Sequence, residues 1–502
     1  MDLKKIELKY FFQFFIAIIV IFFVFELNYY RHWTSIEDQD LTLIHNSLLL
    51  NSGEKAEYHD HPGHTKILFL SLWLNLLDII RILNISSYDD LKFSDNIKND
   101  FTKLVIYSRF LNALIGILFA YVFYNLNKVL TKNKNSSYLL LILFITSFPF
   151  LNSISHIRTE LLSSVFILFS FLNLFKLVSK DNLNRKYIFY IGFFLTLSIF
   201  SKFQSIFIFL LLPIFLSWIK KKRIQIKKNF FEQKKIHFYL SIILFIGMFL
   251  IWFKYSKGIN LIFFPIFIIY FYIFLTYVNK IYFKDNQIYL IFLFNFFLGI
   301  SFAFILLYSL KPFHTNNISM IANFFGASSM FVQGSNPYEL GLIDAVKLIN
   351  KAFFSFLYYI KITFISHSFN EVILLLLSFA SSYFVNKKDP KFLKNFLKFT
   401  LFLFTIMFIF SVRPSINYLI YFVPFIYLFL NYSFKKLNSR YFYNCLIVLL
   451  ILVNFFTGID FIKKQKFISQ EDLICNEKAL NNSAYFYGRM RLEIFPFACK
   501  KY

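Results

Sequence analysis

The sequence has little charge. Only 16% of its 502 residues are Asp, Glu, Lys or Arg, whereas 58% are hydrophobic, and the mean hydropathy is +0.59. Soluble domains carry about 25% charged residues, so this composition excludes a soluble globular fold. Apolar runs of about 20 residues recur along the whole chain, as bilayer-spanning helices require. The sequence therefore predicts an all-α polytopic membrane protein.

Other features are missing as well. The 3 cysteines show no CxxC or other metal-type spacing. No internal repeat indicates the inverted halves of a transporter. The N-terminal MDLKK and the apolar run after it are similar to a signal sequence, but the run is too long and no small-residue cleavage site follows. We therefore expect an uncleaved anchor with a cytoplasmic N-terminus.

Acidic residues are also in the minority, which gives a net charge of +26. In a soluble protein this charge would suggest nucleic acid as a partner. Here the Lys and Arg residues gather in short loops that alternate with apolar runs, so they indicate the cytoplasmic side of a bacterial inner membrane. We expect no nucleic-acid partner. The alternation predicts thirteen spans: residues 10–29, 104–126, 138–155, 161–178, 187–200, 203–219, 238–253, 260–278, 288–310, 368–385, 396–411, 416–432 and 441–457.

The predicted domains follow from these spans. Residues 1–457 form the transmembrane domain, with long outer loops at residues 30–103 and 311–365, and residues 458–502 form a short outer tail. Cys475 and Cys499 are the only cysteines predicted outside, where thiols oxidise, so we expect a disulfide between them. Two unrelated cysteines are the alternative.

The first outer loop is acidic. Residues 30–103 hold 7 Lys and Arg against 11 Asp and Glu, the opposite of the bias in a cytoplasmic loop. Residues 65–83 are apolar enough to span, but they contain Asp78 and Arg81. We therefore expect an interfacial helix that lies along the outer surface.

The start of this loop concentrates titratable side chains. Charged groups at a membrane boundary are costly unless they face water or a site, so the loop is a candidate active site, and ordinary solvation is the alternative. The carboxylates and histidines are Glu37, Asp38, Asp40, Glu54, Glu57, Asp60, His45, His59, His61 and His64.

Two patterns in the loop suggest a metal ion. His59, His61 and His64 could ligate a divalent metal such as zinc, although they sit in a Pro/Gly turn. Asp38-Gln39-Asp40 matches the Asp-x-Asp of nucleotide-sugar enzymes, in which a metal bridges a diphosphate. Nucleotide sugars are cytoplasmic and this pair is expected outside, which argues against that mechanism. A divalent metal is kept as a candidate cofactor.

Further polar residues fall on the outer side. The positive-inside rule makes outer arginines unexpected, and a lipid phosphate is a natural partner because guanidinium binds it bidentately and lysine as a point charge. Snorkelling to lipid headgroups is the alternative for any single arginine. These outer residues are Arg109, Arg158, Glu160, Lys202, Arg413 and Tyr418.

Taken in order, these pieces resemble the GT-C membrane glycosyltransferases, specifically the group of protein O-mannosyltransferases and lipid A aminoarabinose transferases. The resemblance covers most of residues 1–220 and, more weakly, residues 411–431. After the acidic residues that follow the first span, its pieces are Asn51-Ser52-Gly53, a His-Pro-Gly turn, Ser108-Arg109-Phe110-Leu111-Asn112-Ala113-Leu114, Arg158-Thr159-Glu160, Ser201-Lys202, and Arg413 with Tyr418 and Pro424.

The resemblance implies a GT-C-like fold of about 13 spans and an inverting transfer of a sugar. In that family the acidic residue after the first span is the catalytic base or orients the acceptor. Asp38 matches it best by its distance from Gly53, with Glu37 and Asp40 as rivals. Glu160 matches a second acidic position, which is usually Asp in the family.

The implied substrates are a polyprenyl-phosphate-linked sugar and a hydroxyl acceptor on an unknown lipid, glycan or protein. Lys202, with Arg109, Arg158 or Arg413, would hold the leaving phosphate, and Tyr418 and His61 complete the candidate binding residues. Two rivals remain. A lipid-linked sugar flippase or transporter predicts charges near mid-membrane, whereas these gather at one face. The arginine-rich late loop of a polysaccharide polymerase is not evident in residues 311–361.

Overall fold

The computed structural model describes a large part of the chain, and every regular element in that part is a helix. The described residues are 15–26, 33, 39–54, 57, 63–131, 134–179, 184–202, 205, 208, 286–310, 416–436, 440–468, 475, 488–499 and the single positions 354, 357, 361, 370, 373 and 376.

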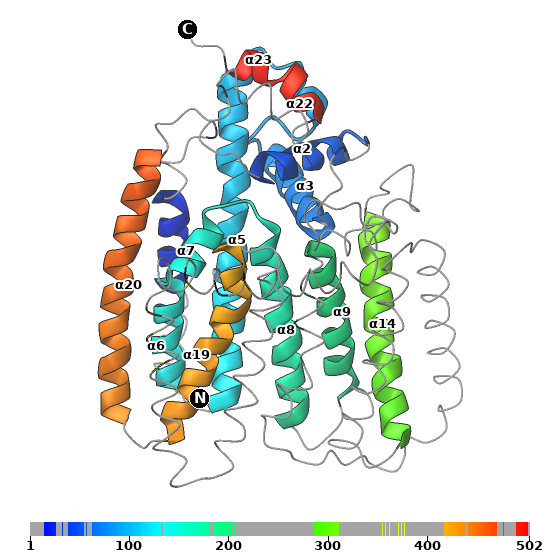
Figure 1. Ribbon diagram of the computed structural model, residues 1–502. Coiled ribbons are helices and arrows are strands. Elements are labelled where there is room, and N and C mark those ends of the chain that lie inside the picture. The colour runs from blue at the N-terminus through cyan, green and yellow to red at the C-terminus, as the bar shows by residue number, and fades with distance from the viewer. Residues whose placement is uncertain are drawn as a thin grey trace.

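A bundle of roughly aligned helices forms the body of the described structure (Figure 1). These helices are rich in Leu, Ile and Phe with few charges, as lipid-embedded helices must be. They are α5 (Ile97–Thr131), α6 (Lys134–Ile145), α8 (Thr159–Ser179), α9 (Arg185–Ser201), α14 (Asn286–Leu310), α19 (Leu419–Lys436) and α20 (Arg440–Ile468).

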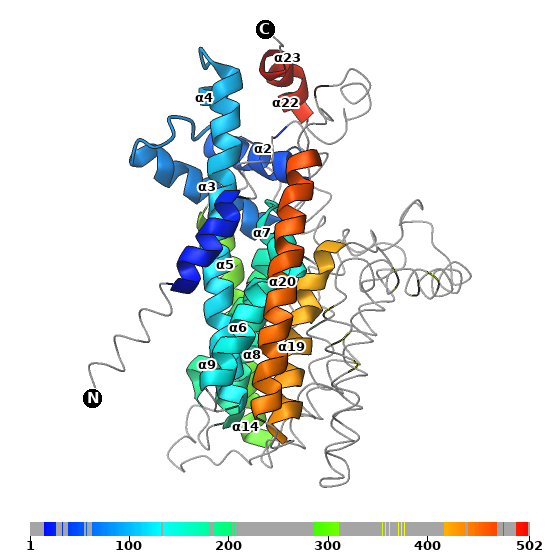
Figure 2. The same ribbon diagram turned by 90° about the vertical axis from the view of Figure 1, so that its left-hand side faces the viewer.

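Helix α5 is longer than the predicted span of residues 104–126. Its 35 residues correspond to roughly 50 Å, whereas the hydrocarbon core of a bilayer is about 30 Å thick. Its N-terminal part therefore projects beyond the bundle and meets the tail helix α23 (Phe495–Ala498) there (Figures 1 and 2). The sequence missed this extension because it is amphipathic rather than apolar.

Residues 138–155, predicted as one span, do not form one continuous helix. The structure breaks this segment into α6 and α7 (Phe148–Ile154), bent by 59°. Pro149 lies in the first turn of α7, where a missing N–H is harmless, but in a continuous helix its ring would clash with the carbonyl of the preceding turn. Ser147, with an extended backbone, marks the break.

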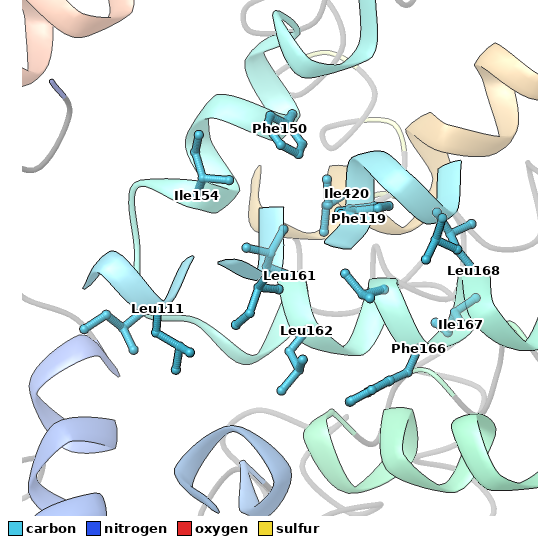
Figure 3. Close-up of a cluster of buried hydrophobic side chains, with 14 of the residues drawn as sticks. Leu111, Phe119, Phe150, Ile154, Leu161, Leu162, Phe166, Ile167, Leu168 and Ile420 are labelled. Carbon is cyan, nitrogen blue, oxygen red and sulfur yellow. The ribbon is translucent and has the colours of Figure 1, made fainter. Parts of the chain in front are cut away.

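Helix α8 lies at the centre of the bundle. It packs between α5 and α9, with α19 beside it. Of an apolar stretch of 18 residues in this helix, 89% is buried inside the protein. Figure 3 shows part of this core, with Leu161, Leu162, Phe166, Ile167 and Leu168 of α8 labelled among side chains of α5, α7 and α19. Small polar residues also line the contact with α9.

Glycines bring α9 and α14 into close contact. A Cβ atom added at Gly192 would overlap the carbonyl oxygen of Phe296, and one added at Gly299 would overlap that of Phe189. Lipid-embedded helices associate mainly through such close packing, because lipid is as apolar as a leucine side chain. The two glycines therefore set the distance between these helices.

Short helices cover one end of the bundle (Figures 1 and 2). They are α2 (Gln39–Asn51), α3 (His64–Ile79), α4 (Tyr88–Lys92), α22 (Gly488–Glu493) and α23. A capping box starts α4, since the Asp90 N–H donates to Ser87 Oγ (3.2 Å) and the Ser87 N–H donates to Asp90 Oδ2 (2.8 Å).

The helix α3 carries an exposed apolar stripe. Phe69, Leu72, Leu76 and Ile79 recur at helical spacing and are all exposed. This pattern is typical of a helix lying in the lipid interface. The position of α3 along the outer surface stays a prediction.

The length and the composition of several helices are those of membrane-spanning helices. Within the described ranges, α5 and α8 each contain a segment long and apolar enough to cross a membrane, and the bent pair of α6 and α7 brings the number to three if it forms one span. Residues 288–310, 416–432 and 441–457 lie in helices as expected. The total of thirteen spans and their orientation stay predictions, and the predicted spans at 238–253, 260–278 and 396–411 lie outside the described residues.

Candidate functional site

A buried ion pair lies where α8 begins and α9 ends. Glu160 is in the first turn of α8, and Lys202 follows the last residue of α9. Lys202 Nζ lies 3.0 Å from Glu160 Oε1, and each side chain is 2% exposed. A carboxylate at a helix N-terminus and an ammonium at a helix C-terminus are both favoured by the helix dipoles. The two residues thus stabilise each other's charge away from water.

Tyr418 closes one side of this pair. It ends the short 3-10 helix Ile416–Tyr418, and Lys202 Nζ lies 5.8 Å from the centre of its ring. This distance allows a cation–π interaction. The adjacent Asn417 accepts a hydrogen bond at Oδ1 from Asn152 Nδ2 (2.8 Å), which ties the turn to α7.

A second buried cation lies on the α3 side. Lys66 Nζ donates to Asn112 Oδ1 of α5 (2.8 Å), and Lys66 has no exposed surface. Asn112 Nδ2 in turn donates to the carbonyl oxygens of Ile154 (3.1 Å) and His156 (2.6 Å). One amide side chain therefore connects α3, α5 and the segment that leads into α8.

Helix α3 also contacts the end of α9. Thr65 Oγ1 donates to the carbonyl oxygen of Leu197 (3.1 Å), and the ring of His64 lies 6.4 Å from that of Phe200. Below this contact Ser163 and Ser198 hydrogen-bond to each other across α8 and α9 (Oγ–Oγ 2.9 Å). The start of α3 is thus held against the last turns of α9, the helix that Lys202 follows.

The remaining predicted residues are placed as follows. Arg109 is fully buried on α5, one turn before Asn112, and Arg158 is half-buried, two residues before Glu160. Asp40 lies in the first turn of α2, and its side chain is outside the described part. Glu37, Asp38, His59, His61 and Arg413 lie outside the described residues.

The structure therefore brings together Glu160, Lys202 and Tyr418, with Lys66 as an addition. Lys66 is not among the residues predicted from the sequence, since the apolar helix that contains it is interpreted there as interfacial. The sequence feature that could have identified Lys66 is a lysine in the first turn of an apolar run, where a charge is costly without a partner. Asn112 gave a similar signal as an amide inside an apolar span.

A second polar cluster lies further out, between the loop and the tail. His45 of α2 is buried, and its Nε2 lies 2.8 Å from Glu57 Oε2. Arg489 of α22 pairs with both Glu54 and Glu57 through its guanidinium, and its backbone N–H donates to Glu57 Oε2 (2.9 Å). Burial alone would raise the pKa of Glu57, but the hydrogen bonds from His45 and Arg489 lower it to about 2.

These pairings bear on the candidate metal ion. Within the described residues no group of three His, Cys, Asp or Glu side chains could hold a metal. His64 stands in the helix α3, and Glu54 and Glu57 are already paired with Arg489. The described donors do not fit a metal site, and His59 and His61 lie outside the described part.

The tail is closed by a disulfide. Cys475 and Cys499 are bonded, with their Cα atoms 5.4 Å apart, as the sequence analysis expected of the two outer cysteines. Cys445 is a free, exposed cysteine in α20.

No protein-family model matches the sequence, and no curated protein matches it. Among solved structures the chain is similar to the oligosaccharyltransferase of Archaeoglobus fulgidus. The crystal structure of its complex with zinc and sulfate matches with a TM-score of 0.44 and 12% sequence identity. The match covers 90% of this chain and 53% of that chain. The crystal structure tethered with an acceptor peptide containing the NVT sequon matches with a TM-score of 0.46 and 10% sequence identity. That match covers 98% of this chain and 59% of that chain. The chain thus spans less than two thirds of the length of that protein.

Proposed function

We propose that the protein is a GT-C-type membrane glycosyltransferase, which moves a sugar from a polyprenyl-phosphate lipid to a hydroxyl acceptor on the outer face of the inner membrane. One observation carries the proposal. Three pieces of the sequence resemblance that are far apart in the chain, at Glu160, Lys202 and Tyr418, meet at one end of the bundle. Helix α2, which begins directly after Asp38, lies across that same end (Figure 1).

The proposed reaction is a displacement at the anomeric carbon of the donor. Asp38 takes the proton of the acceptor hydroxyl or orients it, the acceptor oxygen bonds to the anomeric carbon, and the bond from that carbon to the phosphate oxygen breaks. The lipid phosphate then leaves with the electron pair. Negative charge grows on this group in the transition state, and fixed cations nearby lower the barrier.

The Glu160–Lys202 pair is compatible with phosphate binding. An ammonium group has three N–H donors, so Lys202 keeps Glu160 and still has donors for a phosphate oxygen. Glu160 orients the ammonium, and Tyr418 limits its position from the other side. Arg158 and Lys66 supply further positive charge around the same end of the bundle.

The test is transfer by the purified protein from labelled lipid-phosphate sugars to cell-envelope fractions. The wild-type protein should transfer label, and Asp38→Asn should lose roughly 10²–10⁴-fold in rate, the range of a positioned acid–base group. Asp40→Asn and Glu37→Gln should cost less. Asp95→Asn is the matched control, since Asp95 is an exposed carboxylate of the same loop and should keep the full rate. Full activity of a normally expressed Asp38→Asn protein would remove Asp38 from the mechanism.

A further inference from the structure

The tail helices α22 and α23 are docked by apolar contacts. Met490, Ile494 and Phe495 are fully buried. The Phe495 ring lies 6.0 Å from the ring of Trp33 and 6.1 Å from that of Phe101 on the projecting part of α5. Helices α22 and α23 are therefore fixed at the end of the bundle where α5 projects (Figure 2).

Arg489 ties this docked tail to Glu54 and Glu57 of the first outer loop. Its guanidinium pairs with Glu54 and Glu57, and it lies 5.1 Å from the ring of Tyr88, which it covers. A guanidinium presents donors in a rigid fork, so two carboxylates on one short segment can be held in a single orientation. Lysine at this position would lack that fork.

Glu57 passes this constraint on to α2. Its carboxylate pairs with the buried His45 at 2.8 Å, and its backbone N–H donates to Asn46 Oδ1 (3.0 Å). Both partners lie on α2, the helix whose first turn contains Asp40 and which starts immediately after Asp38. A chain of contacts thus runs from the tail to the helix that carries the candidate carboxylates.

We propose that Arg489 is a positioning residue of the transferase, which sets the place of α2 through Glu57 and His45. The inference rests on the proposed function, and Arg489 itself touches no substrate. The contacts of Arg489 described above do not involve Glu160 or Lys202, so its loss should leave that ion pair in place. Loss of Arg489 should therefore lower kcat and leave the KM for the lipid donor nearly unchanged.

The experiment compares Arg489→Ala with Lys92→Ala. Lys92 forms an exposed ion pair with Glu493 of the same tail helix (2.8 Å), so its removal controls for a general loss of surface charge pairing. Arg489→Ala should lower kcat by roughly 10²-fold, the cost of misplacing a catalytic group by about 1 Å. Lys92→Ala should keep the wild-type rate, and Arg489→Lys should fall between them. If Arg489 acts through Glu57, the double variant Arg489→Ala/Glu57→Gln should be no slower than Glu57→Gln alone.

Hydrogen–deuterium exchange of α2 gives a readout that needs no activity. Amides of α2 should exchange about tenfold faster in Arg489→Ala than in the wild type. In Lys92→Ala their exchange rate should be unchanged. A wild-type kcat for Arg489→Ala overturns the proposal, as does a lower kcat with unchanged exchange in α2. Absence of sugar transfer by the wild-type protein would instead refute the proposed function, and exchange in α2 would then decide alone whether Arg489 holds this helix.

Discussion

Glu160 and Lys202 illustrate what a buried ion pair demands of its partners. Each side chain is 2% exposed, so removing either one leaves the other charge without water and without its partner. Breaking such a pair costs about 3–5 kcal/mol, whereas replacing both members by uncharged residues is often neutral. Stability and activity should therefore separate in variants of this pair.

We expect Lys202→Met and Glu160→Gln each to destabilise the fold by about 3–5 kcal/mol, and the double variant to recover most of that loss. Thermal unfolding in detergent measures the stability, and transfer from the lipid donor measures the activity. If Lys202 holds the leaving phosphate, the double variant should fold well and remain inactive. A stable double variant with wild-type transfer would show that the pair is only structural.

Glu57 makes the outer cluster sensitive to acid. Its folded pKa of about 2 lies below its ordinary value of 4.5, so its stabilising effect is complete above pH 4.5 and is lost as the pH falls towards 2. Arg489 is 37% exposed, so water screens the pair and the effect should be on the order of 1 kcal/mol. The melting temperature of the wild type should fall more steeply between pH 5 and pH 3 than that of Glu57→Gln. Parallel curves would contradict this assignment.

Sequence reasoning identified Glu160, Lys202 and Tyr418 as separate candidates, because polar groups at span ends stand out against apolar runs. It could not show that Glu160 and Lys202 pair with each other, since their contact depends on how α8 packs against α9. Arg489 gave no signal either. An arginine in a polar tail has no reason to be noted until the fold places two carboxylates beside it.

At the scale of helices, hydropathy predicted best where a helix is surrounded by lipid or by other spans. The predicted spans 161–178, 187–200 and 288–310 end within two residues of α8, α9 and α14. Hydropathy failed where the mean over a segment concealed a single helix-breaking residue or an amphipathic stretch. Pro149 breaks the run that was predicted as one span, and the projecting part of α5 is amphipathic and so fell outside the predicted segment.

The glycine contact between α9 and α14 should not tolerate a side chain. In Gly192→Ala or Gly299→Ala the added methyl group meets backbone, which cannot move aside as a side chain can. We expect a loss of about 1–3 kcal/mol, typical of overpacking. Gly116→Ala is the matched control, because its added Cβ meets only side-chain atoms of Val20, Ile154 and Phe150 at 3.1–3.4 Å. Thermal unfolding measures the stability of the three variants. Equal stability of all three would refute the close backbone contact between α9 and α14.

For the whole molecule, the disulfide and the docked tail act together. The Cys475–Cys499 bond joins residues 24 positions apart, and a loop of that size corresponds to about 3 kcal/mol of stabilisation by chain entropy. We expect Cys475→Ser/Cys499→Ser to lower the melting temperature and to release the tail to proteases, while Cys445→Ser changes neither. Alkylation of the native protein at all three cysteines would contradict the bond.

The contact between Arg489 and Glu57 also has a consequence for biosynthesis. The two residues are 432 positions apart, and at about 5–20 residues per second a ribosome needs roughly 20–90 seconds to make the chain between them. During that interval the first loop is already exposed, but Arg489 has not yet been made. Truncated chains that stop after α20 would insert their spans and still lack this contact. Under our proposal, the protein becomes fully active only when its tail has been translated and docked.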